Sequence, residues 1–150
     1  MTLDDLLARE GIRDLVTRYN SYSDTGRFEP LWALFAEHAV METADSDGDV
    51  AVFAGRDNIA QIFTGAQRRV RAQIEAAGPA YVRHFTATHQ IDLVDADHAT
   101  GRCYFAVIVD SGLDHWGRYI DRYVRIEGEW KFEHRRVALD GRVATSWFAS

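Results

Sequence analysis

The chain has 150 residues, the length of one ordinary globular domain, and its 47% hydrophobic and 27% charged residues exclude a disordered or collagen-like chain. Its net charge of −6 argues against a nucleic-acid partner, because binding to a phosphate backbone depends on clustered Lys and Arg. The single cysteine excludes a disulfide framework and a cysteine-rich zinc site. We therefore expect residues 1–150 to form one domain.

Two further features bear on where the protein acts. The longest apolar run, residues 104–109, is far shorter than the roughly 20 residues that a spanning helix needs. The first residues lack the basic region and the apolar stretch of a signal peptide. We therefore expect a cytoplasmic protein with no membrane partner.

The N-terminal residues have the pattern of a helix. Thr2 and Asp5 form a weak capping box at its start. After a predicted break at Gly11, an apolar stripe at helical spacing runs to the polar residues 24–26, where the helix should end. The stripe consists of Ile12, Leu15, Val16, Tyr19 and Tyr22.

Short elements are expected to follow. Pro30 suits the first turn of a second helix, whose apolar face includes Leu34 and Phe35. Residues 39–43 and 50–54 are expected to be short strands on either side of a polar loop.

A third helix is expected to begin with Asp57 and Asn58 as caps and to end at Gly78 and Pro79. Its apolar residues recur at helical spacing, which predicts one buried face. They are Ile59, Ile62, Phe63, Ala66, Val70 and Ile74.

The chain changes character after Pro79. Residues 81–94, 99–110, 115–126 and 129–137 are rich in β-branched and aromatic side chains and are separated by short hairpin signals. Helices followed by a run of long antiparallel strands are typical of an α+β fold, in which helices pack on one face of a curved sheet.

The sequence patterns that resemble metal or cofactor sites are incomplete. Asp45, Asp47 and Asp49 imitate the start of a calcium loop, but its required glycine and glutamate are missing. His84 and His89 are five residues apart on a predicted strand, which sends them to opposite faces unless a bulge intervenes. The sequence contains no glycine-rich nucleotide loop. We expect no metal and no organic cofactor.

A few ionisable residues lie among apolar ones and are candidates for chemistry. Asp24 ends the first helix, His84 opens the first long strand, and Arg135 lies on the last strand beside aromatic residues. Each also has a structural interpretation, as a turn aspartate, a core histidine and an edge ion pair respectively. Tyr119 and Asp121 share one face of the third long strand, which is either exposed to solvent or lines a pocket.

Several segments, in this order and spacing, resemble the SnoaL-like proteins of the nuclear-transport-factor-two-like superfamily. The resemblance extends from about Leu3 to Val137 and implies a cone of helices packed against a curved, mainly antiparallel sheet. The matching segments are residues 12–24, 28–36, 55–59, 83–85, 117–123 and 128–132.

The resemblance also implies catalytic residues. The branch that contains scytalone dehydratase and hexachlorocyclohexane dehydrochlorinase uses an aspartate–histidine dyad, which matches Asp24 and His84. Arg135 occupies the place of the dehydrochlorinase arginine, whereas Tyr19 stands where that enzyme has a lysine. Scytalone dehydratase also has a second histidine near a position that is Val109 here. These departures place either particular substrate in doubt and leave the dyad intact.

The dyad has a clear chemical use. A neutral imidazole removes a proton from carbon or oxygen when a carboxylate holds its other nitrogen and stabilises the imidazolium that forms. Arg135, Tyr19 and Tyr119 are candidate donors to the negative charge that develops on a substrate. An apolar pocket is expected to be lined by Trp32, Phe35, Phe63 and Tyr104, which are equally interpretable as core.

The favoured hypothesis is a cofactor-independent, dehydratase- or cyclase-like lyase or isomerase acting on a small hydrophobic cyclic or polyketide-like compound. The alternative is a non-catalytic protein of the same fold, either a small subunit of a ring-hydroxylating dioxygenase or a module that binds an apolar ligand. In either case we expect a homodimer or homotrimer that associates through an outer sheet face. That face carries Arg118, Ile120, Arg122 and Val124.

Overall fold

The computed structural model describes residues 1–76 and 78–148, except for the side chains at positions 66, 70, 71 and 73–75. Its helices and strands follow in the order α1 (Leu3–Asp24), α2 (Phe28–Trp32), β1 (Phe35–Ala44), β2 (Val50–Ala54), α3 (Arg56–Glu75), β3 (Val82–Leu93), β4 (His98–Val109), β5 (Gly112–Ile126) and β6 (Glu129–Arg142). Among the helices so described, none combines the length and the apolar character that crossing a membrane requires.

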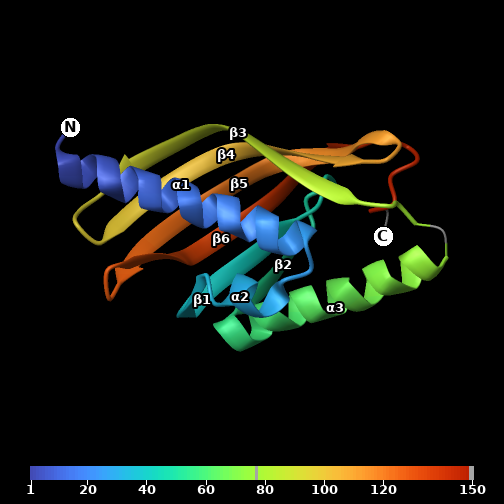
Figure 1. Ribbon diagram of the computed structural model, residues 1–150, viewed down its shortest axis with the longest axis horizontal. Coiled ribbons are helices and arrows are strands. Elements are labelled where there is room, and N and C mark those ends of the chain that lie inside the picture. Colours follow the sequence, from blue (N-terminus) through green and yellow to red (C-terminus); the bar gives the residue numbers. More distant parts are fainter. Residues whose placement is uncertain (77, 149–150) are drawn as a thin grey trace.

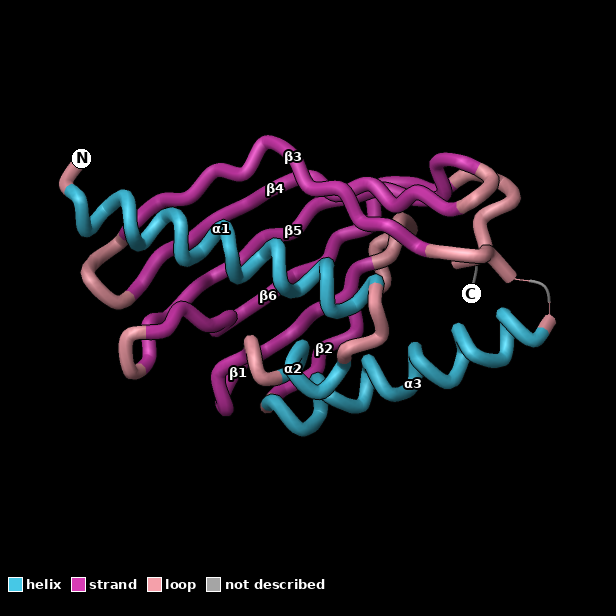
Figure 2. The backbone as a smooth tube through the Cα atoms, viewed as in Figure 1, coloured by secondary structure: helices cyan, strands magenta, loops and turns pink. Residues whose placement is uncertain are grey.

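The strands form one six-stranded sheet in the order β2-β1-β6-β5-β4-β3. Neighbours pair antiparallel except β1 and β6, whose pairing is parallel. The three helices lie along one face of the curved sheet, with α1 passing over the long strands and α3 below it near β1 and β2 (Figures 1 and 2). The expected α+β cone of helices on a mainly antiparallel sheet is confirmed.

Helix α1 corrects the predicted break at Gly11, because it is continuous from Leu3 to Asp24. A Cβ atom at position 11 would lie 2.9 Å from Cδ1 of Trp130, so the glycine allows this ring of β6 to pack against the helix backbone. The capping box at Thr2 and Asp5 is confirmed.

The second and third helices also differ from expectation. Helix α2 ends at Trp32, so Leu34 lies in the following turn and Phe35 opens β1. Helix α3 begins one residue before the expected cap, at Arg56. Its predicted stripe is buried at Ile59 and Phe63, whereas the side chains of residues 66, 70 and 74 lie outside the described part.

The core between α1 and the sheet is aromatic. The ring of Tyr19 meets the rings of Phe35, Phe63, Tyr119 and Phe132 edge-on, with centroids 5.7–6.1 Å apart. Edge-to-face packing of this kind stabilises aromatic pairs beyond their buried area. The rings form a closed layer between the helices and the middle of the sheet.

Candidate active site

A cavity of about 1050 Å³ opens between the helices and the end of the sheet that lies near the C-terminal segment. Its wall comes from the last turn of α1, from α3 and from strands β1 to β6, so the fold closes it with residues far apart in sequence. The lining is mostly apolar, as in typical sites for small organic molecules.

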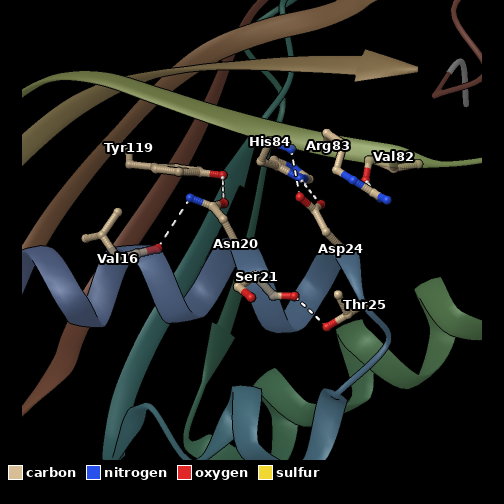
Figure 3. Close-up of polar contacts among 9 residues, drawn as sticks. All are labelled: Val16, Asn20, Ser21, Asp24, Thr25, Val82, Arg83, His84 and Tyr119. Atoms are coloured by element: carbon tan, nitrogen blue, oxygen red, sulfur yellow. Dashed lines mark hydrogen bonds and ion pairs between the residues drawn. The ribbon is translucent and has the colours of Figure 1, made fainter. Parts of the chain in front are cut away.

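Asp24 and His84 meet at this cavity, as the sequence predicted (Figure 3). The Asp24 Oδ1 atom lies 2.6 Å from His84 Nδ1, and Oδ2 accepts a hydrogen bond of 2.8 Å from the backbone N–H of His84. Because an ionised carboxylate can only accept, Nδ1 carries a proton, and in the neutral imidazole the lone pair is then on Nε2. The two side chains are 9% and 18% exposed, and both line the cavity.

Asp24 occupies an unfavourable place for an acidic residue. It is the last residue of α1, at the negative end of the helix dipole, and the last helical turn holds no basic residue. The two N–H groups of His84 supply the compensating hydrogen bonds. A local electrostatic conflict that is resolved by one tertiary partner is typical of a functional position.

A second aspartate–histidine pair lies at the same cavity and was not predicted from the sequence. His115 Nδ1 lies 2.8 Å from Asp114 Oδ2 at the beginning of β5. Asp114 also accepts hydrogen bonds from Ser146 Oγ at 2.5 Å and from the Trp147 backbone at 3.1 Å. The available signal was strand alternation, since His115 lies four residues before Tyr119 and therefore on the same face.

Burial shapes the acid–base character of this second pair. It lowers the pKa of His115, ahead of the opposing effect of Asp114. For Asp114, burial alone would raise the pKa, but the hydrogen bonds from Ser146, His115 and Trp147 together leave it lowered. His115 is therefore a neutral imidazole beside an ionised carboxylate at neutral pH.

The two predicted tyrosines also reach the cavity. Tyr119 donates a hydrogen bond of 3.0 Å from its hydroxyl to Asn20 Oδ1, and the Asn20 amide in turn donates to the Val16 carbonyl (Figure 3). Burial raises the pKa of both Tyr19 and Tyr119, so both remain protonated phenols. Asn20 was missed because nothing in a helical pattern distinguishes a buried asparagine from an exposed one.

Arg135 does not join the site, which corrects the prediction that it converges on the cavity with Asp24 and His84. Its side chain is fully buried and binds both oxygens of Asp121, at 2.9 and 2.8 Å. Its guanidinium stacks on the rings of Tyr19, Tyr119 and Phe132, with 4.0–4.2 Å to their centroids. Arg135 is thus part of the closed core and not of the cavity wall.

The predicted apolar wall is right only in part. Phe63 lines the cavity, whereas Trp32 and Phe35 lie outside its wall, the latter fully buried in the core. Tyr104 is 56% exposed on the outer face of the sheet. The neighbouring residue Phe105 lines the cavity instead, because successive side chains of a strand point to opposite faces.

Other candidates for chemistry lie away from the site. Burial raises the pKa of the Cys103 thiol to about 11, which makes it a poor nucleophile. A bulge between Ala87 and Gln90, with Thr88 at a φ of 54°, shifts the register of β3 between His84 and His89. Even so, no group of three or more metal-binding side chains gathers in the described residues.

Comparison with known proteins places these observations in a family. A family model described as a SnoaL-like domain matches residues 4–136. No curated protein matches the chain in sequence.

Solved structures share the whole fold. A putative scytalone dehydratase from Novosphingobium aromaticivorans is 23% identical, with a TM-score of 0.72, over 100% of this chain and 99% of its own. The beta subunit of a putative aromatic-ring-hydroxylating dioxygenase from the same organism is 18% identical, with a TM-score of 0.73, over 97% of both chains. An NTF2-like protein with a cystatin-like fold, also from Novosphingobium aromaticivorans, is 28% identical, with a TM-score of 0.69, over 97% of this chain and 94% of its own. These likenesses confirm the nuclear-transport-factor-two-like fold.

Proposed function

The chain belongs to the SnoaL-like domain family, and on that premise we propose that it is a cofactor-independent lyase or isomerase acting on a small hydrophobic ring compound. The observation that carries the proposal is that Asp24 accepts hydrogen bonds from both the ring and the backbone N–H of His84. These two hydrogen bonds fix the imidazole in one orientation and one tautomer at the wall of an apolar cavity.

The proposed reaction begins with proton removal. His84 Nε2 takes a proton from a carbon next to a substrate carbonyl, and the electron pair of that C–H bond forms an enolate. Asp24 stabilises the resulting imidazolium through Nδ1–H. In a dehydration the enolate re-forms the carbonyl and expels a β-hydroxyl, which takes the proton back from Nε2 and leaves as water. In an isomerisation the same proton returns to another carbon.

Donors are needed for the negative charge on the enolate oxygen. Arg135 is bound to Asp121 and enclosed by rings, so it is not proposed for this role. Tyr119 already donates to Asn20. Tyr19 lines the cavity as a protonated phenol and is the proposed donor.

Deuterium exchange tests the proposal without knowledge of the natural substrate. The probe is 2-tetralone, an apolar bicyclic ketone with acidic C–H bonds, followed in D₂O by NMR. We expect the protein to accelerate exchange at the carbons beside the carbonyl, and His84→Ala to lower that rate by about 10²-fold or more. The matched control is His98→Ala, because His98 forms an exposed pair with Asp95 at 2.9 Å outside the cavity wall. Exchange no faster than in buffer, or equal loss in both variants, would refute the proposal.

The second candidate is a non-catalytic subunit or ligand-binding module. The likeness in fold to a dioxygenase beta subunit supports it. Assembly alone gives no reason to hold a histidine at a cavity by hydrogen bonds from both its ring and its backbone N–H, which favours the enzyme. A larger protein that co-purifies with the chain, together with a silent His84→Ala variant, would favour the subunit.

A further inference from the structure

The two histidines of the cavity lie in one row across the sheet. In the pairing of β3 with β4, His84 is opposite Val107, and in the pairing of β4 with β5, Val107 is opposite His115. Residues directly opposite one another share a face, so both imidazoles project from the concave side. Two strand spacings separate their backbones by about 10 Å.

The ring of Phe105, two residues before Val107 on the same face of β4, lies near both imidazoles. Its ring centroid lies 6.4 Å from that of His84 and 6.3 Å from that of His115. All three residues line the cavity. A flat apolar ring seated against Phe105 would therefore have one histidine near each edge.

Like His84, His115 has its ring orientation set by an aspartate. Asp114 accepts a hydrogen bond from its Nδ1. The ring of Phe148 stacks on the imidazole, with 4.4 Å between the ring centroids and 15° between the ring planes. Ser146 and Trp147 fix Asp114 in turn, so the C-terminal segment forms the outer support of this imidazole. No described residue hydrogen-bonds to Nε2 of His115.

The charges around His115 decide what Nε2 does. Burial is the largest influence on the pKa of His115 and lowers it, the acidic neighbour Asp114 raises it, and the nearby His84 adds a smaller lowering effect. A neutral ring whose Nδ1–H is donated to Asp114 presents a lone pair at Nε2. Such an atom accepts a hydrogen bond.

We propose that His115 is a substrate-binding residue whose Nε2 accepts a hydrogen bond from a hydroxyl group of the substrate, at the opposite edge of the ring from the atom that His84 deprotonates. The inference deepens the proposed function and rests on it. It narrows the substrate class to hydroxylated apolar ring compounds, such as phenols or ring alcohols. It also assigns the C-terminal segment a role in positioning this group.

A binding experiment tests the inference with two probes that differ by one hydroxyl group. Equilibrium dialysis at pH 7 gives the affinities for 2-naphthol and naphthalene, and their ratio measures the preference for the hydroxyl. The variant is His115→Asn, because the Asn amide can still donate to Asp114 but is too short to place an acceptor atom where Nε2 lies. We expect the ratio to fall by about tenfold in this variant, the cost of leaving a buried hydroxyl unpaired. In the His98→Asn control the ratio should stay unchanged.

The possible outcomes separate this inference from the proposed function. An unchanged ratio in His115→Asn, or no binding of 2-naphthol by the wild type, overturns the inference. A fall in His84→Asn without a fall in His115→Asn also overturns it, and leaves the proposed base in place. Failure of 2-tetralone exchange with an intact, His115-dependent ratio would refute only the proposed chemistry.

Discussion

Two aspartate side chains between the helices and the sheet each accept a hydrogen bond from a basic side chain, Asp121 from Arg135 and Asp24 from His84, and their surroundings give the two pairs different roles. Asp121 and Arg135 are both 0% exposed, and three aromatic rings enclose the guanidinium. Asp24 and His84 are partly exposed, and one edge of the imidazole faces a cavity. A charge pair that is closed off on all sides organises the core, whereas a pair with one free nitrogen can act on a ligand.

Removing one partner of the closed pair should produce the largest effect on stability. Arg135→Met leaves the Asp121 carboxylate buried without its cation, and we expect a loss of about 3–5 kcal/mol in the free energy of unfolding, measured by urea denaturation. The control is Arg118→Met, which breaks the more exposed pair with Asp140 and should cost no more than about 1 kcal/mol. Equal losses would show that the buried pair has no special structural role.

Substitution in the Asp24–His84 pair should have the opposite pattern, a large loss of exchange rate with little loss of stability. Asp24→Asn should lower the rate of 2-tetralone exchange by about 10²-fold, because the amide cannot stabilise an imidazolium. The free energy of unfolding should change by no more than about 1 kcal/mol, since a lost hydrogen bond is offset by relief at the end of the helix dipole. Asp95→Asn, in the exposed pair with His98, is the matched control and should leave the rate unchanged. A loss of stability as large as that of Arg135→Met would contradict the comparison.

The boundary between the closed core and the cavity is tightly packed at Gly117. A Cβ atom there would overlap the Ala138 carbonyl oxygen and lie 2.8 Å from the Phe105 ring. We expect Gly117→Ala to cost about 1–3 kcal/mol, measured by urea denaturation. Gly65→Ala is the control, because its Cβ meets nothing within 4 Å in α3 and helix propensity predicts a gain of up to about 1 kcal/mol. An unchanged free energy of unfolding in Gly117→Ala would show that the sheet accommodates a Cβ atom at this position without cost.

A smaller effect is expected from pH. Burial lowers the pKa of His115 below its ordinary value of 6.5, so the unfolded chain binds a proton in a range where the folded chain does not. Stability should therefore fall as the pH drops below 6.5. In His115→Asn the difference in unfolding free energy between pH 7 and pH 5 should be smaller than in the wild type. An identical difference would show that His115 is as easily protonated in the folded protein as in the unfolded chain.

A substitution on the outer face of the sheet should have the smallest effect on the Asp121–Arg135 and Asp24–His84 pairs. We propose that the chain forms a homodimer or homotrimer there, and that Ile120→Asp, which places a charge between Arg118 and Arg122, shifts the mass to that of a monomer. Light scattering at micromolar concentration measures this. A monomeric wild type would contradict the proposal, and exchange of 2-tetralone by the variant should be unaffected because Ile120 lies outside the cavity wall.

Much of the architecture was encoded locally. The capping box at Thr2, the helical stripe up to Tyr19 and the four long strands after Pro79 were all predicted, because side-chain periodicity and turn residues act over a few positions. The meeting of Asp24 with His84 was predicted from resemblance to the SnoaL-like proteins. Nothing local to either residue indicated that they would lie side by side.

Only the tertiary structure decided which face of each strand looks inward. Strand β4 has apolar residues at both odd and even positions, so its pattern did not distinguish Phe105, which lines the cavity, from Tyr104, which faces outward. Arg135 and His115 show the same limit. Whether a charged side chain is enclosed by rings from other elements or opens onto a cavity depends on contacts between distant segments. The sequence determined where helices and strands form, and packing determined which of their side chains are free to react.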